Sequence, residues 1–420
     1  MPTAQSDQPA PALPADADGL SRDPVVAVFV GGGTGGHLYP GVAIAERLRQ
    51  MHALTRCVFV CSDRAVDKAV LTGAGVNEAD FVPIGARPVV LRPRGLLNFL
   101  RSWGPSVRAC RALVRELGKA SGARLVVVAM GGFVAAPAVQ AARAEGLPVL
   151  LVNLDAEPGK ANRWIAGRCH RALSVFPVAH RYARRWNVVP PIVRAGAALN
   201  LDARECKRRL GLNPEKPVLM ITGGSLGAGS INRLLLELVS DRSSCLRSNP
   251  WQVLHQCGEA NDRAPSDAPA AGADELRRAY KLAGVEARVE TLVKEMGLWW
   301  GSADLALSRA GAGAVAEAWA NRVPTVFLPY PYHKDQHQKL NAQRLGEGAV
   351  VTTDLIEPGA NVRAVGPILE ELMANEGRRN GMREALERLG PADGAGVAAR
   401  VVLEMARAAA HAGVRNGGRR

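Results

Sequence analysis

Short apolar runs alternate with amphipathic stretches along most of the chain. Runs rich in Val, Ile and Leu are typical of parallel strands that are buried on both faces. In the first half of the chain such runs begin at Val25, Cys57, Leu125, Pro148 and Ala172. Helical patterns lie between them, such as Ala43 to Met51 and Val107 to Leu117. This alternation predicts a doubly wound α/β sheet.

The pattern is interrupted once and then resumes. The stretch Val188 to Asp202 contains the adjacent Pro190 and Pro191 and predicts a hinge. Beyond it, apolar runs begin at Pro217, Trp251, Asp304, Val323 and Ala349. We therefore expect two Rossmann-like doubly wound α/β domains that face each other across a cleft, because ligands of such sheets bind at the carboxyl ends of the strands.

These patterns also predict the boundaries of the parts. Residues 1–20 are rich in Pro, Ala and Asp and lack the pattern of a signal peptide, whereas Glu259 to Asp274 has the composition of an exposed loop. We expect a disordered tail over 1–23, an N-terminal domain over 24–190, a hinge over 191–202, a C-terminal domain over 203–390, a helix over 391–410 that returns to the N-terminal domain, and a basic tail over 411–420.

Composition narrows the class of partner. Apolar residues make up 47% of the 420 residues, which is enough for a sizeable core. The 53 Lys and Arg outnumber the 39 Asp and Glu by 14, which favours an anionic partner: a nucleic acid, an anionic membrane or a phosphorylated substrate. Because aromatic residues are only 5% and no DNA-reading motif is present, we expect no nucleic acid.

The cysteines argue against a disulfide-rich or zinc-ribbon protein, and the longest apolar window argues against a membrane-spanning one. None of the seven cysteines forms a CxxC pair, which argues against a disulfide framework or a zinc ribbon and favours a reducing compartment. The window Leu125 to Ala142 has nearly the length of a membrane span, but Gly131, Gly132 and Pro137 interrupt it. We expect a strand, a glycine turn and a helix there.

A glycine-rich loop follows the first strand. Glycine lets the backbone approach a phosphate or a sugar, and the next helix offers free N–H groups. Gly31, Gly33 and Gly36 match GxGxxG, and Asp63 is placed as the acidic partner of a ribose, so an NAD-dependent oxidoreductase is one interpretation. His37 next to this loop is a candidate general base, or else a histidine that only hydrogen-bonds the turn.

The second half repeats the strand, glycine turn and helix. The segment from Gly223 to Ala228 carries the hydroxyl of Ser225 and would suit a diphosphate, although an ordinary tight turn would have the same composition. Glu317 follows Gly311 and Gly313 in the first turns of another helix, where it would accept hydroxyls of a ribose or simply complement the helix dipole.

Taken together, the motifs resemble one family. The segments GGGTGGHLYPG, MGGFVAAPA, GGSLGA, HQCG, SRAGAGAVAEAWANRVPTVFLPYP and HKDQHQKLNA occur in this order. From about Val25 to Leu403 the chain resembles the MurG family, glycosyltransferase family 28, which has the GT-B fold and transfers GlcNAc from UDP-GlcNAc to lipid I to make lipid II.

The resemblance implies roles for individual residues. His37 would activate the acceptor hydroxyl, with Gly36 and Asp155 also in the catalytic set. Ser225 and the neighbouring backbone would hold the diphosphate, Glu317 the ribose, the backbone of Leu292 and Val293 the uracil, and His337 with Gln338 the GlcNAc hydroxyls. The full donor-binding set implied is Thr34, Gly35, Asn162, Gly224, Ser225, Leu226, Gly227, Leu292, Val293, Arg309, Glu317, His337 and Gln338.

The implied reaction inverts the anomeric carbon and uses no metal or other cofactor. Main-chain N–H groups and helix dipoles would stabilise the leaving diphosphate. The one DxD triplet, Asp16 to Asp18, lies in the predicted tail, where a metal-dependent transferase could not use it.

An apolar stripe flanked by arginines predicts a membrane-facing surface. It comprises Leu96, Leu97, Phe99, Leu100 and Trp103, with Arg87, Arg92, Arg94, Arg101 and Arg108 nearby. Such a stripe suits an anionic leaflet, although a helix that packs on the core has the same pattern. The resemblance implies a cytoplasmic protein, peripheral on the inner face of the plasma membrane.

Three departures from the family pattern leave the acceptor open. Val152-Asn153-Leu154-Asp155 stands where the family usually has His-Glu-Gln-Asn, Ala197-Ala198-Leu199-Asn200 replaces Asn-Pro-Val-Arg, and Gly313 or Ala314 replaces a hydroxyl residue. A related transferase with another lipid or glycan acceptor, and a non-catalytic membrane-docked paralogue, therefore remain alternatives beside the NAD-dependent oxidoreductase.

Overall fold

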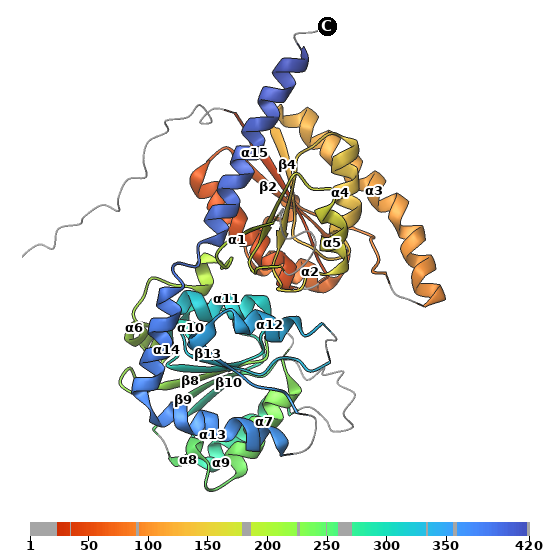
Figure 1. Cartoon of the computed structure of the whole chain (residues 1–420). Helices are drawn as coiled ribbons and strands as arrows, with labels where there is room; N and C mark the ends of the chain where they lie inside the picture. Colours follow the sequence, from red (N-terminus) through yellow and green to blue (C-terminus); the bar gives the residue numbers. More distant parts are fainter. Residues whose placement is uncertain are drawn as a thin grey trace, which may run out of the picture.

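Two α/β domains lie one above the other in the computed structural model (Figure 1). The structure describes residues 23–33, 35–89, 92–178, 186–224, 227–248, 250–258, 271–332, 335–355 and 359–417. The predicted tail thus lies outside the described residues except for Asp23, as does most of the predicted loop that begins at Glu259.

The N-terminal domain is built on a parallel sheet of order β3-β2-β1-β4-β5-β6-β7. Its strands are β1 (Val25–Val30), β2 (Thr55–Ser62), β3 (Phe81–Ile84), β4 (Arg124–Ala129), β5 (Val149–Asn153), β6 (Arg171–Ser174) and β7 (Trp186–Val188). Its helices are α1 (Gly35–Met51), α2 (Ala65–Gly73), α3 (Pro93–Ser121), α4 (Ala135–Ala144) and α5 (Lys160–Ala166). All residues of β1 are buried, as expected for a parallel strand with helices on both faces of its sheet.

The C-terminal domain repeats this plan with the order β10-β9-β8-β11-β12-β13, again parallel. Its strands are β8 (Val218–Thr222), β9 (Gln252–Gln256), β10 (Ala287–Glu290), β11 (Leu305–Ser308), β12 (Thr325–Phe327) and β13 (Ala349–Val351). Its helices are α6 (Ala203–Arg209), α7 (Gly229–Ser240), α8 (Cys245–Ser248), α9 (Ala273–Ala283), α10 (Met296–Ser302), α11 (Ala312–Asn321), α12 (His337–Gln343), α13 (Ala360–Ala374) and α14 (Glu376–Arg388). The α/β fold class is confirmed.

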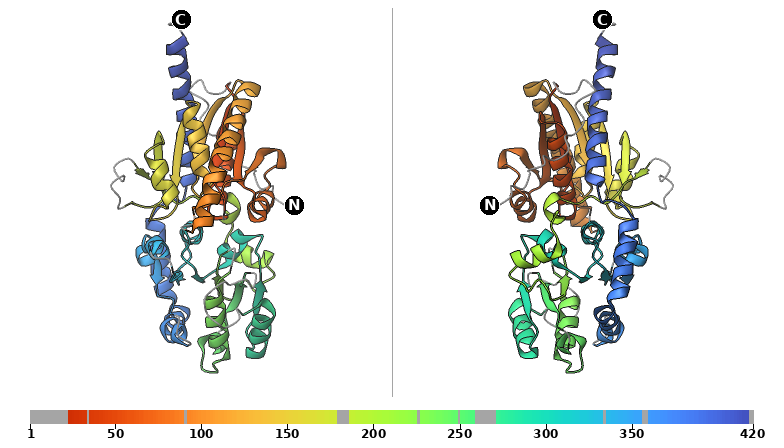
Figure 2. Two further views of the ribbon diagram at one scale, coloured as in Figure 1. Left: turned by 90° about the vertical axis from the view of Figure 1, so that its right-hand side faces the viewer. Right: turned by 90° about the vertical axis from the view of Figure 1, so that its left-hand side faces the viewer.

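The last helix, α15 (Gly394–Gly417), runs from the lower domain up along the N-terminal domain (Figures 1 and 2). It packs on α1 and β4. One apolar cluster includes Leu48 of α1, Trp300 of α10 and Val402 of α15, so the core continues from one domain into the other.

The segment predicted to hold a membrane span folds as β4, a turn at Gly131 and Gly132, and α4. Within the described ranges, no helix combines the length and the apolar character that crossing a membrane requires.

Candidate active site

The loops that follow β1 and β4 lie together, because these strands are neighbours at the point where the strand order changes direction. Gly33 adopts a φ of +90°, and a Cβ added there would approach Phe133 to 2.7 Å. The chain then enters α1, which begins at Gly35, well before the expected helical stretch at Ala43. Pro40 in its second turn explains the difference, since proline is a poor sequence signal inside a helix.

A buried carboxylate that the sequence analysis did not select holds this loop. Asp67 of α2 accepts hydrogen bonds from the N–H of Gly33 at 3.0 and 2.9 Å and from the N–H and hydroxyl of Ser62 at 2.9 and 2.6 Å. Asp63, the proposed ribose partner of a dinucleotide, instead pairs with Arg87 at 2.6 Å on the surface. No motif marks Asp67; a signal would have been an acidic residue in the first turn of a helix after the second strand.

His37 lies in the first turn of α1 against the glycine pair that follows β4. A Cβ on Gly131 would come within 3.3 Å of Nε2 of His37 and 2.9 Å of Oδ1 of Asn162. Burial lowers the pKa of His37 below its ordinary value, while the charges of Asp155 and Asp67 act in the opposite direction. A neutral imidazole can accept a proton, which is compatible with the predicted role of His37 as a general base.

Asn162 of α5 is buried beside His37, and its Oδ1 accepts no hydrogen bond from any residue that the structure describes. Its Nδ2 donates to Oδ1 of Asn153 at the end of β5, which fixes the orientation of the amide. An unsatisfied buried acceptor is costly and suits a ligand that brings a donor.

The loop after β5 contacts the other domain. Asn341 of α12 donates from Nδ2 to Oδ1 of Asp155 at 3.0 Å, and its Oδ1 accepts from the N–H of Ala156 at 2.8 Å. The predicted catalytic residue Asp155 therefore lies between the region of His37 and the helix that carries His337 and Gln338.

The second glycine loop is a tight turn between β8 and α7. Gly224 has a φ of +81° and its N–H donates to Oγ1 of Thr222 at 3.1 Å. Gly227 has a φ of +78°, and a Cβ there would lie 2.3 Å from the carbonyl oxygen of Cys257. The turn leads directly to the N–H groups of the first turn of α7. Ser225 and Leu226 lie outside the described residues, as does Thr34 of the first loop.

Arg309 follows the end of β11, and its guanidinium bonds to residues of its own domain around this turn. It pairs with the buried Asp354 at 2.7 Å and donates to the hydroxyl of Ser230 at 2.8 Å and the carbonyl of Leu328 at 2.8 Å. Ser230 in turn donates to Asp354 at 2.7 Å. Arg309 thus braces the start of α7, near the expected position of the nucleotide.

Glu317 lies on α11 and is partly buried. Its Oε2 accepts a hydrogen bond from Nε1 of Trp300 at 2.8 Å. Burial raises the pKa of Glu317 to about 7, although the Trp300 hydrogen bond and the charge of Arg194 lower it. Arg194, in the segment between the domains, also stacks over Tyr39 of α1 at 4.2 Å, so a cation that the sequence analysis did not select lies at this interface.

The remaining residues predicted to bind the donor sugar nucleotide lie in loops and at helix ends of the C-terminal domain. His337 begins α12, with Nδ1 2.7 Å from Oδ1 of Asp335, and Oε1 of Gln338 accepts from the N–H of Tyr330 at 2.8 Å. Leu292 is 59% exposed and Val293 partly buried in the loop between β10 and α10.

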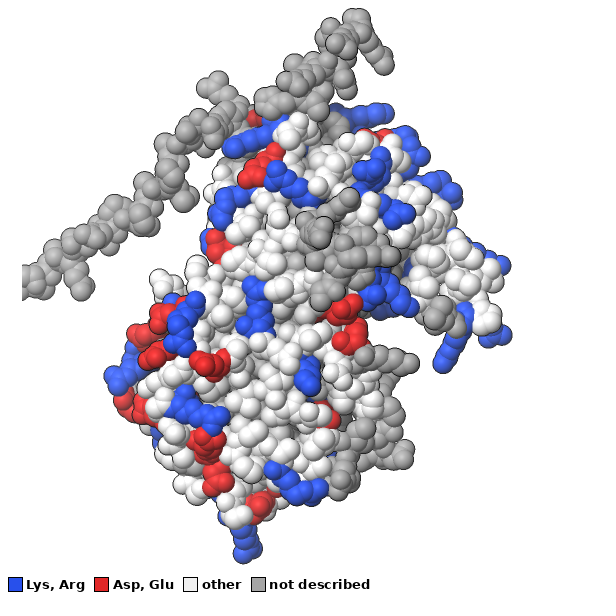
Figure 3. Space-filling model, in the orientation of Figure 1, with Lys and Arg blue, Asp and Glu red and all other residues white. Residues whose placement is uncertain are grey.

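The predicted membrane stripe divides into an exposed and a packed part. Leu96, Leu97 and Leu100 are 44%, 45% and 61% exposed at the end of α3 that projects from the domain, with Lys and Arg around this end (Figures 1 and 3). Trp103 instead packs edge-on against Trp164 at 5.9 Å, and Phe99 lies 5.4 Å from Trp103. The packed part of the stripe thus fits a helix that packs on its own domain, and docking of the exposed part on a membrane stays a prediction.

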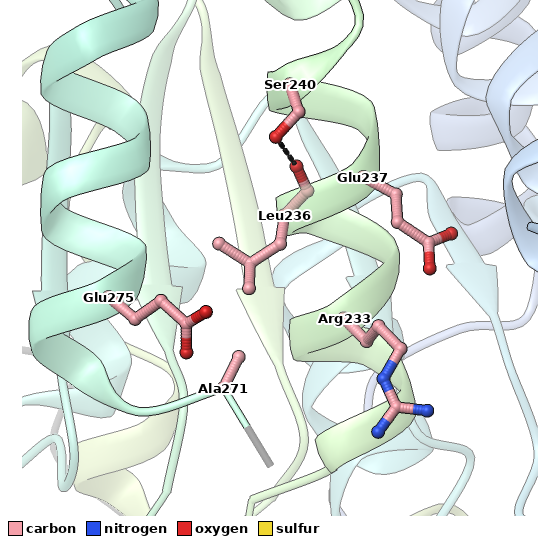
Figure 4. Close-up of a pocket in the computed structure, with 6 residues that line it drawn as sticks. All are labelled: Arg233, Leu236, Glu237, Ser240, Ala271 and Glu275. Atoms are coloured by element: carbon pink, nitrogen blue, oxygen red, sulfur yellow. Dashed lines mark hydrogen bonds between the residues drawn. The ribbon is translucent and has the colours of Figure 1, made fainter. Parts of the chain in front are cut away.

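A cavity of about 310 Å³ lies elsewhere, between α7 and α9 (Figure 4). It holds none of the predicted site residues; its lining is Arg233, Leu236, Glu237, Ser240, Ala271 and Glu275. Over the described part of the chain, no three His, Cys, Asp or Glu side chains gather as metal ligands would. That the reaction needs no metal stays a prediction.

Comparisons with known proteins agree with this geometry. The glycosyltransferase family 28 N-terminal domain matches residues 27–174, and the family 28 C-terminal domain matches residues 218–386. A UDP-N-acetylglucosamine--N-acetylmuramyl-(pentapeptide) pyrophosphoryl-undecaprenol N-acetylglucosamine transferase of Halorhodospira halophila is 34% identical over 84% of this chain and 91% of its own. The protein of the same name from Xylella fastidiosa strain M12 is 33% identical over 90% of this chain and 95% of its own.

Solved structures share the fold. A crystal structure of Acinetobacter baumannii MurG superposes with a TM-score of 0.63 at 21% identity, over 91% of this chain and all of that one. A UDP-GlcNAc 2-epimerase of Neisseria meningitidis bound to UDP-GlcNAc superposes with a TM-score of 0.56 at 12% identity, over 91% of this chain and 98% of that one.

Proposed function

Because the chain belongs to glycosyltransferase family 28, we propose that it transfers N-acetylglucosamine from UDP-N-acetylglucosamine to the C4 hydroxyl of the N-acetylmuramyl unit of lipid I. The observation that carries this proposal is the agreement among relatives of 30–34% identity, which match most of the chain and have the same enzyme name. The protein is thus an enzyme of peptidoglycan synthesis, a hexosyltransferase that uses a nucleotide sugar.

In the proposed reaction the acceptor oxygen attacks the anomeric carbon from the face opposite UDP. The bond between that carbon and the diphosphate oxygen breaks, UDP leaves with the electron pair, and the hydroxyl proton passes to His37. The lowered pKa of His37 supports this role, because the imidazole is neutral and able to accept a proton at pH 7. The nearby Asn162 has a buried Oδ1 that no residue in the described ranges hydrogen-bonds, and it could accept from a donor group of a substrate.

The C-terminal domain supplies the donor half of the proposed site. The N–H groups at the glycine turn and at the start of α7 suit the diphosphate, whose charge grows as the bond breaks. We assign Glu317 to the ribose hydroxyls, the backbone of Leu292 and Val293 to the uracil, and His337 with Gln338 to the GlcNAc hydroxyls. Arg309 supports this site indirectly, because its guanidinium donates to the hydroxyl of Ser230 at the start of α7.

We further place the enzyme on the inner face of the plasma membrane, bound peripherally. The support is the exposed set Leu96, Leu97 and Leu100 with the exposed Arg92, Arg94 and Arg101 on the same end of α3. Apolar side chains would enter the interface while each arginine contributes roughly 1 kcal/mol on anionic lipid.

A turnover assay tests the function. Purified enzyme, labelled UDP-N-acetylglucosamine and lipid I in detergent should give labelled lipid II and free UDP. Parallel assays with other lipid-linked or glycan acceptors test the alternative of a related transferase, since the segment Val152 to Asp155 departs from the family pattern. Absence of transfer to every acceptor, with UDP-GlcNAc still bound, would instead indicate a non-catalytic paralogue.

A further inference from the structure

Helix α12 joins the two domains along one face. His337 and Asn341 are spaced i and i+4 on this helix, and Arg344, which caps its C-terminal end, continues the same spacing at i+7. Asn341 meets the loop after β5, and the guanidinium of Arg344 lies 5.6 Å from the ring of Phe176 after β6. The helix that carries the proposed sugar contacts thus rests on the carboxyl edge of the N-terminal sheet.

The contact at Asn341 is directional. Its amide is fully buried and uses both ends on successive residues of one loop: Oδ1 accepts from the N–H of Ala156, and Nδ2 donates to the carboxylate of Asp155. Two hydrogen bonds from one planar group fix a helix in position and orientation, whereas apolar packing alone allows sliding. The bond to a carboxylate is also of the stronger, charge-assisted kind.

Asp155 faces the acceptor half as well. It belongs to the loop that starts at the end of β5, where the side chain of Asn153 donates to the carbonyl of Asp155 at 2.7 Å. Asn153 also accepts from Asn162, and Asn162 lies against Gly131 beside the ring of His37. A chain of hydrogen bonds and contacts therefore runs from Asn341 through Asp155, Asn153 and Asn162 to His37.

We propose that Asp155 is a positioning residue that, through Asn341, holds the donor-sugar helix α12 in register with His37. This inference rests on the proposed transfer reaction. The pair sets the distance between the anomeric carbon, held from the C-terminal domain, and the base, held from the N-terminal domain. Reaction rates depend steeply on such alignment, so the pair acts mainly on turnover rather than on donor affinity.

The test exchanges the two side chains. Asn341→Asp sets two carboxylates against each other and should lower kcat about 10- to 100-fold, the range for a lost hydrogen bond to a charged group. Asp155→Asn keeps an acceptor oxygen for Asn341 and should stay within about tenfold of the wild type. The double variant Asp155→Asn/Asn341→Asp restores a donor facing a carboxylate and should recover most of the activity lost by Asn341→Asp. Gln343→Glu adds the same charge to an exposed position of α12 and serves as control.

Two measurements decide the outcome. Calorimetry without acceptor should give a Kd for UDP-N-acetylglucosamine within about threefold of the wild type for all four variants, so that the loss appears in kcat. A double variant no better than Asn341→Asp, or a loss that lies wholly in donor affinity, would overturn the inference. If the wild type transfers no GlcNAc, the proposed function fails instead. The midpoints of thermal unfolding of the same variants then decide whether the pair exists, because only a real pair is restored by the exchange.

Discussion

Both oxygens of the Asp67 carboxylate share the N–H of Gly33, which lies 34 residues earlier in the chain. The same carboxylate accepts two hydrogen bonds from Ser62 at the end of β2. One buried side chain thereby connects the first glycine loop to the second strand. Since this loop leads into the turn of α1 that carries His37, Asp67 helps to hold the proposed base in place.

Asp67→Asn should destabilise the protein. The amide offers one acceptor oxygen where the carboxylate offers two, and its NH₂ group would face N–H donors, so we expect a loss of about 2–4 kcal/mol in the free energy of unfolding. Urea unfolding measures this loss. Asp63→Asn is the matched control, because its pair with Arg87 is exposed and should contribute no more than about 1 kcal/mol. Equal small losses for both variants would contradict the role of Asp67.

Glu317→Gln should raise stability in a manner that depends on pH. Because burial raises the pKa of Glu317 from its ordinary value of 4.5 to about 7, the folded protein holds its proton more tightly than the unfolded chain. The stabilising effect of that proton is complete below pH 4.5 and is lost as pH rises through about 7. Glutamine carries no charge at any pH, so thermal unfolding should show a larger gain over the wild type at pH 8 than at pH 5. A constant difference across this range would contradict the raised pKa of this carboxyl group.

Substitutions of Glu317 should also weaken the binding of UDP-N-acetylglucosamine. If Glu317 accepts hydrogen bonds from both ribose hydroxyls, its replacement by Ala should cost about 1–3 kcal/mol of binding, and replacement by Gln somewhat less. Calorimetry with UDP-N-acetylglucosamine measures this. An unchanged Kd for both variants would remove Glu317 from the site.

Replacing Leu96, Leu97 and Leu100 by Ser should reduce binding to vesicles that contain anionic lipid. Their exposed area is available to a membrane, whereas Trp103 donates to Gln140 and packs on its own domain. We expect at least about a tenfold loss, since burying such a side chain contributes on the order of 1.5–3 kcal/mol. Co-sedimentation measures it, with Leu282→Ser as control because Leu282 is 85% exposed on α9 of the other domain. Equal binding of the triple variant and the control would show that this end of α3 does not dock.

The central strands could be predicted from the sequence because they are buried on both faces and need apolar side chains at every position. Three strands were missed: β3, β7 and β10, each at the edge of its sheet. An edge strand has one free side and tolerates polar residues, and β3 contains Pro83, whose missing N–H an edge position allows. Burial, which produces the sequence signal, is weakest at these edges.

The geometry of the candidate site could be predicted from the sequence only where the backbone conformation requires glycine. Gly224 and Gly227 need left-handed backbone angles, so the turn that they form is visible as a motif. No motif indicates the contacts of Asp67, of Arg194 or of Asn341 with Asp155. These contacts join segments that lie far apart in the chain. The exposure of Leu96 and the packing of Trp103 likewise depend on the length of α3, which one amphipathic stretch does not reveal.

His37→Ala should lower turnover without loss of donor binding. General bases contribute typically about 10²- to 10⁴-fold, so kcat should fall within that range. The Kd for UDP-N-acetylglucosamine should change less than about threefold, because most of the proposed donor contacts come from the other domain. Parallel losses in kcat and in donor affinity would indicate that His37 supports the fold of the site instead.

Asp155→Asn should shift the pH dependence of the reaction. Burial lowers the pKa of His37, and the carboxylates of Asp155 and Asp67 oppose this effect by favouring the protonated ring. Without the charge at position 155 that pKa should fall further, so the acid limb of the profile of kcat/KM against pH should move to lower pH. Glu157→Gln is the control, because Glu157 lies in the same loop but pairs with Arg163. If the acid limb stays in place in Asp155→Asn, or moves equally in the control, then the proton that limits the reaction does not reside on His37 beside Asp155.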